Sequence, residues 1–445
     1  MKKKRAFIIN RAVTVLILGL ILSILFMPGI VKAEKSHDGE TVDVVIPAAS
    51  NQYIAHKARV EQFEEDTGIE VNYIGIPYGN IRGKLMTEGV SMRGKYDVVH
   101  YNSTWMASLS KFLQPLGSYV QEDNYEMNKF PEVYQRAVKF DGNTYGVPYR
   151  GHVEVFYYRK DLFSDLDLEV PENWGDLMEV GKVIQDKTDL HGAAMYGSAG
   201  QAQQNKYCWA PLLWSNSGEI FNESWEPVFN NEEGVEATQR WVNLMNEIGA
   251  PGSKAFNEQD AQNSLAQGKS ATMWGWWWMY RIVNSEDTAT EEVVGNIDLA
   301  PMPKWEGEKR AGAALLLPVG IMESSKHKGA AWEYIKWATQ REIEKDIVMD
   351  TWTGEAPSGQ GTIVVVHKKN LKDPEINEVS NGLYEKALGT IEGARMFPQI
   401  PEWPEISEVI GEALSSISSG AKVETQLDNA AKQVRGIMKR AGYYD

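Results

Sequence analysis

Four tryptophans and a tyrosine fall within seven residues, from Trp274 to Tyr280. Flat aromatic rings stack on the C–H faces of sugars, while charged and amide side chains bond the sugar hydroxyls. The run is therefore either a dense piece of core or a surface that holds a flat ligand with an apolar face. Because a strand predicted over 270–274 ends at Gly275, we expect Trp274 to be core and the following rings to begin a helix at the strand exit.

Other segments also combine rings with polar side chains where a predicted strand gives way to a loop or helix. Ligands of open α/β sheets bind at such places. Residues 51–53 stand at a predicted helix N-terminus, where free backbone N–H groups can meet a ligand, although they could equally cap the helix. The predicted ligand-binding residues in these segments are Asn51, Gln52, Tyr53, Tyr101, Asn102, Trp105, Arg150, His152, Glu154, Trp276, Trp278, Tyr280 and Trp403.

Motifs for catalysis or cofactor binding are not found in the sequence. It has no glycine-rich phosphate loop, no HExxH, no GxSxG and no paired cysteines for a metal. We therefore expect no cofactor and no metal, and no enzymatic activity, although the many carboxylates leave a glycosidase pair open as an alternative. Cys208 is the only cysteine, so no intramolecular disulfide can form, and we expect it to be buried.

The N-terminus has the composition of an export signal. A basic start precedes an apolar run, and small residues follow near Ala33, so we predict a signal peptide over 1–33, with an uncleaved membrane anchor as the alternative. Its removal takes six of the 45 basic residues and none of the 61 acidic ones, which leaves 39 − 61, a net charge of about −22. Such an acidic surface disfavours nucleic acid as a partner. We predict a periplasmic or extracytoplasmic protein.

Alternating strand and helix patterns predict a mostly parallel α/β sheet covered on both faces. The expected strands lie at 41–47, 69–77, 96–102, 296–304 and 314–322, and a hairpin turn at Asp141-Gly142. The expected helices lie at 50–68, 80–94, 171–187, 231–247, 257–267, 326–347, 405–418 and 423–441. About 412 mature residues exceed a single core, so two domains are expected. Prolines at 148, 301, 303 and 318 mark the predicted passages between them.

Six segments that occur in order resemble one known family. They are "VEQFEEDTGIEVNY" (60–73), "YDVVHY" (96–101), "DGNTYGVPY" (141–149), "FYYRKDLF" (156–163), "LAQGKSATMWG" (265–275) and "IPEWPEISEVIGEAL" (400–414). Together they resemble the exported substrate-binding proteins of carbohydrate ABC importers, the group that contains the maltose/maltodextrin-binding proteins. The resemblance covers nearly all of residues 41–441.

The resemblance implies a type II periplasmic-binding-protein fold, in which two lobes close around a ligand. It places residues 41–148 and 299–320 in the N-lobe, and residues 149–296 and 321–445 in the C-lobe. Its register assigns stacking to Trp278, whereas helical geometry alone favours Trp276 with Tyr280. It also adds Trp352 to the predicted site.

The sequence departs from the family at two positions. A stacking tryptophan of the family would fall near Ser407, and Trp403 is the substitute we expect. An acidic hydroxyl acceptor would fall near His152, where Arg150 and Glu154 are the local substitutes. These departures put maltodextrin itself in doubt as the ligand.

We therefore predict a monomeric substrate-binding protein that delivers a sugar, oligosaccharide or polyol to a membrane ABC permease. Two alternatives stay open. An aromatic cage could bind a quaternary ammonium compound such as choline or betaine, and a carbohydrate-active hydrolase could use the same rings.

Overall fold

The computed structural model describes residues 36–48, 51–200, 203–354 and 361–444. The predicted signal peptide (1–33) lies outside the described residues, as do the side chains of residues 51–53. Within the described ranges, no helix has the length and apolar character needed to cross a membrane.

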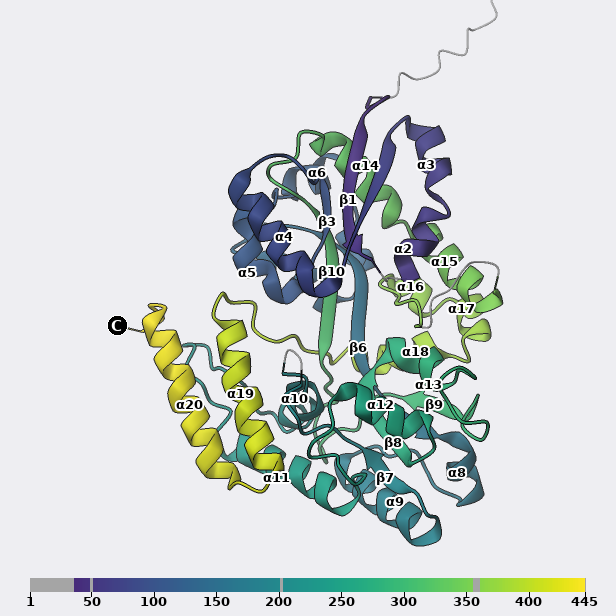
Figure 1. Ribbon diagram of the computed structural model, residues 1–445, viewed down its shortest axis with the longest axis vertical. Helices are drawn as coiled ribbons and strands as arrows, with labels where there is room; N and C mark the ends of the chain where they lie inside the picture. Colours follow the sequence, from purple (N-terminus) through teal and green to yellow (C-terminus); the bar gives the residue numbers. More distant parts are fainter. Residues whose placement is uncertain (1–35, 49–50, 201–202, 355–360, 445) are drawn as a thin grey trace, which may run out of the picture.

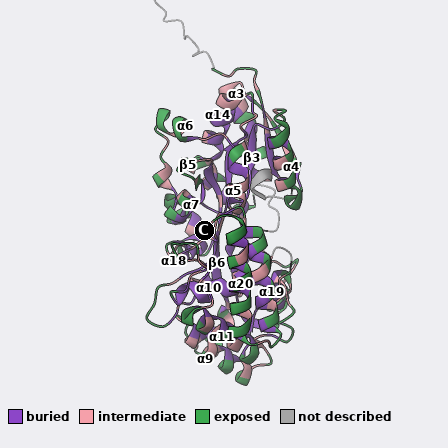
Figure 2. Cartoon of the chain, turned by 90° about the vertical axis from the view of Figure 1, so that its left-hand side faces the viewer, coloured by how far each residue is buried: buried purple, intermediate pink, exposed green. Residues whose placement is uncertain are grey.

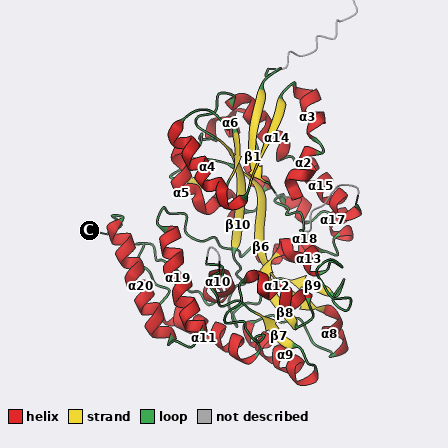
Figure 3. Ribbon diagram, viewed as in Figure 1, coloured by secondary structure: helices red, strands yellow, loops and turns green. Residues whose placement is uncertain are grey.

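One mixed sheet runs through the molecule in the strand order β2-β1-β3-β10-β6-β8-β7, and β9 pairs with β6 on the edge opposite β8. Figure 3 shows these strands along the long axis of the molecule, with helices on both sides. The strands are β1 (Thr41–Pro47), β2 (Glu70–Ile76), β3 (Val98–His100), β6 (Val147–Arg159), β7 (His191–Ala194), β8 (Ser270–Trp276), β9 (Ile297–Ala300) and β10 (Ala314–Ile321). The mixed sheet flanked by helices confirms the predicted α/β class, but the prediction of a mostly parallel sheet is wrong. The pairs β1–β2, β1–β3 and β7–β8 are parallel, whereas β10 and β6 run antiparallel to each of their neighbours.

Strand β6 joins the two halves of the molecule (Figure 1). Its first seven residues pair with β10, while residues 154–159 pair with β8 and β9. Pro148 lies within β6, and Pro318 lies within β10 where the pairing register shifts between Leu317 and Val319. Proline has no N–H to donate to a ladder, which accounts for a shift at this point.

Helices cover both halves of the sheet. Those of the upper half in Figure 1 include α2 (Asn51–Lys57), α3 (Val60–Thr67), α4 (Tyr78–Ser91), α5 (Met106–Leu109), α6 (Gly117–Glu122) and α14 (Lys328–Ala338). Helix α7 (Glu132–Ala137) packs on β6 and β10. Those of the lower half include α8 (Lys160–Asp165), α9 (Trp174–Lys187), α10 (Asn205–Ser215), α11 (Glu232–Glu247), α12 (Glu258–Ala266), α13 (Tyr280–Val283), α19 (Trp403–Ser418) and α20 (Val423–Arg440). Between them lie α15 (Arg341–Thr353), α16 (Lys368–Leu371), α17 (Pro374–Val379) and α18 (Leu383–Ile391).

Short elements complete the described chain. The hairpin predicted at Asp141-Gly142 is confirmed: β4 (Lys139–Phe140) and β5 (Asn143–Thr144) pair around two residues with positive φ. The 3-10 helices are η1 (Ser103–Trp105), η2 (Ser110–Phe112), η3 (Met127–Lys129) and η4 (Trp277–Met279).

The helix predicted from Trp276 onward is wrong. Strand β8 continues through Gly275 to Trp276, because Gly275 pairs with Val155 and Trp276 pairs with Glu154 of β6. The next three residues form η4, and α13 begins only at Tyr280. Trp276 and Tyr280 therefore do not share a helix face. Trp274 is fully buried, as predicted.

The helix predicted over 326–347 consists of two helices. Helix α14 ends at Ala338, and α15 begins at Arg341. The break buries Thr339, whose hydroxyl donates to the carbonyl of Ile335 at 2.6 Å. Helix α14, which the resemblance placed with the C-lobe, packs on β1 and β10 in the upper half.

Candidate functional site

Two aromatic rings of the upper half, those of Tyr78 and Trp105, lie next to each other. Tyr78 is the first residue of α4, and Trp105 is the last of η1; their ring centroids are 5.7 Å apart. Asn102 caps η1 by accepting the N–H of Thr104 at 2.9 Å, and its Nδ2 donates to the Tyr78 hydroxyl at 2.7 Å. Tyr78 keeps 43% of its surface exposed, so its ring is open to a ligand.

Two further rings belong to the lower half. Tyr207 of α10 and Trp276 at the end of β8 meet edge to face, with centroids 4.9 Å apart. Burial raises the pKa of the Tyr207 hydroxyl, and the nearby Tyr78 raises it further. The two halves thus bring tyrosines close to each other. We call Tyr78, Trp105, Tyr207 and Trp276 the ring cluster.

Three polar side chains from β6 lie between the halves. Arg150, His152 and Glu154 alternate along the strand and so point to one face of it. Each has a buried polar atom without a hydrogen-bond partner among the described residues: Nε of Arg150, Nδ1 of His152 and Oε1 of Glu154. We call these three residues the polar row.

The polar row is linked to the ring cluster. The His152 ring lies 6.2 Å from the Trp276 ring. Although part of the Tyr78 side chain is exposed, the atoms packed around its hydroxyl raise the pKa of that group, and the Asn102 hydrogen bond and the charge of Arg150 oppose this rise. Burial also lowers the pKa of His152 well below its usual value, with Arg150 adding to the effect. His152 is therefore neutral at pH 7, with one ring nitrogen able to accept and the other able to donate.

Glu154 is fully buried, which favours the protonated form of its carboxyl group. Its Oε2 accepts the N–H of Ala313 at 2.9 Å. Burial raises its pKa well above the usual value, which the Ala313 bond opposes, and the nearby Glu258 raises it further. A protonated carboxyl group can donate as well as accept a hydrogen bond.

A second buried acid lies beside the lower rings. Burial raises the pKa of Glu258 to about 7, against the lowering effects of the Trp276 indole N–H and of Lys206. Gln204 donates to its Oε2 at 3.1 Å. Burial lowers the pKa of Lys206 to about 7, against the raising effect of Glu258, and its Nζ lies 4.5 Å from the Tyr207 ring centroid.

The arrangement is suited to holding a small neutral molecule that has both C–H faces and hydroxyl groups. The ring cluster offers apolar faces, and the polar row offers donors and acceptors in surroundings of low dielectric constant, where each bond to a ligand is strengthened. Among the residues that the structure describes, no group of three or more His, Cys, Asp or Glu side chains could hold a metal ion.

The other predicted residues lie apart from this arrangement. Tyr101 is a core side chain with 1% exposure, and its hydroxyl donates to the Tyr145 carbonyl at 3.2 Å. Trp403 is buried and stacks on Phe397, which in turn meets the Tyr207 ring edge to face. For residues 51–53 only the backbone, in α2, is described.

The remaining three predicted residues are Trp278 of η4, Tyr280 of α13 and Trp352 of α15. Tyr280 and Trp352 have ring centroids 6.2 Å apart, and the Trp352 indole N–H donates to Tyr384 at 3.4 Å. Trp278 is half-buried, and its carbonyl accepts the N–H of Thr362 at 2.9 Å.

Four residues of the site were not predicted: Tyr78, Lys206, Tyr207 and Glu258. A signal for Tyr78 was present in the sequence, because Tyr78 directly follows Pro77, the proline that ends the strand predicted over 69–77. Tyr207 and Lys206 lie in α10, which shows no helical periodicity because all of its residues but one are buried.

Comparisons with known proteins agree with this geometry. The family model of the bacterial extracellular solute-binding proteins matches residues 47–345. A probable amino-acid ABC transporter periplasmic-binding protein of Sinorhizobium fredii is 25% identical over 400 residues, which are 86% of this chain and 85% of that protein. The mannitol-binding protein of Pseudomonas aeruginosa is 23% identical over 424 residues, 88% of this chain and 92% of that protein.

A solved structure gives the fold independently. The maltose-bound MalE3 of T. maritima superposes with a TM-score of 0.73 and 24% identity, covering 89% of this chain and 99% of that one. At this identity the likeness establishes the fold alone, and it confirms the predicted two-lobe α/β architecture.

Proposed function

The chain belongs to the bacterial extracellular solute-binding protein family, and from this premise we propose that it captures a sugar or polyol between the ring cluster and the polar row. The bound molecule is then delivered to the permease of an ABC importer. The protein acts outside the cytoplasm as a monomer, binds no nucleic acid and catalyses no reaction on its ligand.

One observation carries the proposal. Three unpartnered polar atoms of β6 are buried beside aromatic rings that belong to both halves of the molecule. A buried donor or acceptor without a partner costs about 1–3 kcal/mol. A ligand with several hydroxyl groups removes that cost while its C–H face covers the rings. The relatives named for mannitol and maltose bind ligands with this same combination of groups.

A quaternary ammonium ligand fits the same site less well. Aromatic cages attract such cations through the ring faces, but here Arg150 and Lys206 adjoin the rings. Arg150 is charged and Lys206, with its pKa lowered by burial to about 7, is partly charged at neutral pH, so both oppose a further positive charge in a buried site. The matching relative named for amino acids gives a second class to test.

A thermal-shift screen tests the proposal. The panel contains polyols, monosaccharides, oligosaccharides, betaine and choline, and amino acids. A ligand at a hundred times its dissociation constant adds about 2.7 kcal/mol to stability, so a true ligand gives a clear rise in Tm. We expect a sugar or polyol to give it, and the Trp276→Ala variant to lose it. A rise with choline or an amino acid alone would assign the site to that class instead.

The screen also separates binding from catalysis. Each sugar that raises Tm is incubated with substoichiometric protein and its products are analysed by chromatography. We expect the sugar to be recovered unchanged. Turnover of many equivalents would show that the protein is an enzyme.

A further inference from the structure

A cavity of about 710 Å³ lies away from the ring cluster and shares no residue with it. It is open to solvent and is lined by α7 on one side and by residues of α15 to α18 on the other. Figure 2 shows α7 and α18 on one side of the molecule and α4, which begins with Tyr78, on the other. Its volume is in the range that suits a small organic molecule.

The floor of this cavity is apolar and contains no aromatic ring. Pro131, Val133, Ile391 and Ala394 are buried beneath it, and Leu388 forms a half-buried wall. The stacking surface that a sugar needs is therefore missing among the lining residues, while an aliphatic group could be buried there.

The rim of the cavity is basic in a strongly acidic chain. Its lining holds five cationic side chains and three carboxylates, a balance of 5 − 3 = +2, whereas the whole chain has a formal net charge of −16. The cationic residues are Arg136, Arg341, Lys368, Lys369 and Lys372.

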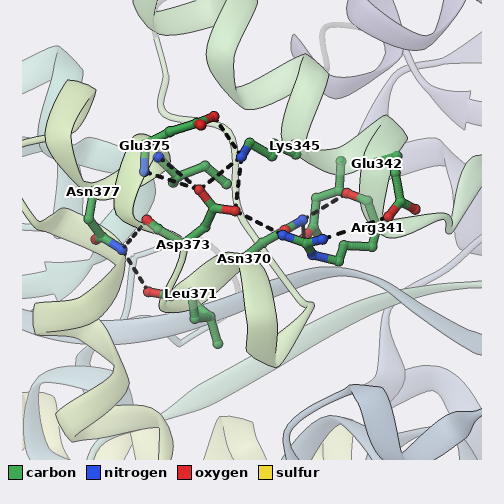
Figure 4. A network of polar contacts seen from close by, with 10 residues as sticks. Arg341, Glu342, Lys345, Asn370, Leu371, Asp373, Glu375 and Asn377 are labelled. Carbon is green, nitrogen blue, oxygen red and sulfur yellow. Dashed lines mark hydrogen bonds and ion pairs between the residues drawn. The ribbon is translucent and has the colours of Figure 1, made fainter.

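Two of the three carboxylates are already paired with cations. Glu132 accepts from Arg136 at 2.7 Å. Asp373 accepts from Arg341 at 2.8 Å and from Lys345 at 3.0 Å, a network that Figure 4 shows from close by. The backbone N–H of Glu375, at 3.1 Å, also reaches the Asp373 carboxylate. Because these charges are compensated, they do not repel an anion in the cavity.

The remaining cations are not held by carboxylates. Lys368, Lys369 and Lys372 are exposed, and none of them makes an ion pair with a described residue. Lys368 donates one hydrogen bond to the Asn128 carbonyl at 3.1 Å, and an ammonium group has two further N–H donors for a ligand. The network around Asp373 also fixes Arg341, whose Nε is buried without a hydrogen-bond partner among the described residues. The three lysines and Arg341 together supply hydrogen-bond donors at the rim of the apolar floor.

We infer that this cavity is a second binding site, for an organic anion that has an aliphatic body and a carboxylate or phosphate headgroup. The headgroup meets the three lysines, and the aliphatic body covers Val133, Leu388 and Ile391. A free amphiphile and an anionic lipid share this chemistry. The inference does not depend on the ligand of the ring cluster.

Calorimetric titration with matched eight-carbon probes tests the inference. Octanoate and octyl phosphate, below their micelle concentrations, carry the required charge, whereas octanol lacks it and octyltrimethylammonium reverses it. We expect the two anions to bind, more weakly as salt is added because exposed charges are screened. Equal heat from octanol would mean unspecific apolar contact and would overturn the inference, as would no binding by either anion.

Substitution of the lysines places the bound anion. The triple variant Lys368→Gln, Lys369→Gln and Lys372→Gln should bind octanoate about tenfold more weakly, the sum of three modest exposed charge contacts. The control Lys84→Gln, Lys432→Gln and Lys439→Gln changes the net charge equally at exposed positions outside the cavity lining. Equal affinities of the two triple variants would contradict the assignment.

Vesicles distinguish the two sources of the anion. Sedimentation with phosphatidylglycerol vesicles, but not with phosphatidylcholine vesicles, would identify a lipid headgroup, provided that the lysine triple variant stays in solution. Binding of octanoate without sedimentation would identify a free amphiphile. Sedimentation that the triple variant retains would show that membrane binding occurs elsewhere and would remove the lipid from the inference.

Discussion

The buried Glu258 predicts how the stability of the protein responds to pH. The substitution Glu258→Gln keeps the size of the side chain and an oxygen that can accept from Gln204, but it removes the titrating group. In the wild type, burial raises the pKa of Glu258 from 4.5 to about 7. The folded state holds this proton more tightly than the unfolded state. The proton therefore makes its full contribution to the free energy of unfolding below about pH 4.5. This contribution is lost as pH rises through about 7.

The magnitude follows from the two pKa values. A tenfold difference in proton affinity corresponds to about 1.4 kcal/mol, so the full effect between these pKa values is about 3 kcal/mol. Roughly 2 kcal/mol of it falls between pH 5 and pH 6.5. Over this range Lys206, with a pKa of about 7, stays mostly protonated and affects wild type and variant alike.

Urea unfolding at pH 5, 5.75 and 6.5 measures the effect. We expect the Glu258→Gln variant to gain about 2 kcal/mol relative to the wild type across this range. The control is Glu412→Gln, which alters an exposed carboxylate of α19. A stability difference between wild type and Glu258→Gln that does not change with pH would refute the reasoning that burial controls this carboxyl group.

Three further predictions concern the fold. Cys208 is buried, and burial raises the pKa of its thiol to about 12, so a thiol reagent should label it only in denaturant; rapid labelling of the native protein would contradict this. Gly151→Ala should lower the free energy of unfolding by about 1–3 kcal/mol, because the added Cβ would lie 2.4 Å from the buried Tyr134 ring; an unchanged denaturation midpoint would show that the ring can move aside. Trp277→Ala should cost about 3–5 kcal/mol, since this indole is 1% exposed and donates to the Gly151 carbonyl at 3.1 Å; a loss below about 1 kcal/mol, measured by chemical unfolding, would contradict its place in the core.

Much of the fold could be predicted because its elements carry regular patterns. Helix α20 spans Val423–Arg440, against a prediction of 423–441, since its apolar residues recur at helical spacing beside a charged face. Helix α10 could not be predicted in this way. Nearly all of its residues are buried, so no polar face reveals the helical period. Pro211 lies inside the helix, and a proline in the sequence argues against a helix at that point.

The candidate site was harder to predict than the fold. Trp276 follows from the rule that strand ends carry ligand groups. The polar row was expected at a strand end by the same rule, but it lies within β6, which spans Val147–Arg159. The choice between Trp276 and Trp278 required knowing that β8 continues past Gly275, which depends on pairing with the distant β6. Tyr207 and Glu258 come from helices that reach the rings only through tertiary packing, so neighbouring residues in the sequence did not reveal them.

Titration of the sugar or polyol found by the screen, with wild type and single variants, tests the central claim most directly. Isothermal calorimetry should show that Trp276→Ala loses at least 1 kcal/mol of binding free energy, which is of the order expected for an aromatic ring contact. The control is Trp403→Phe, which changes a ring that stacks on Phe397 and is not part of the ring cluster, and the folded variant should keep most of its affinity. Affinity that is unchanged in a folded Trp276→Ala variant would contradict the placement of the ligand at the ring cluster.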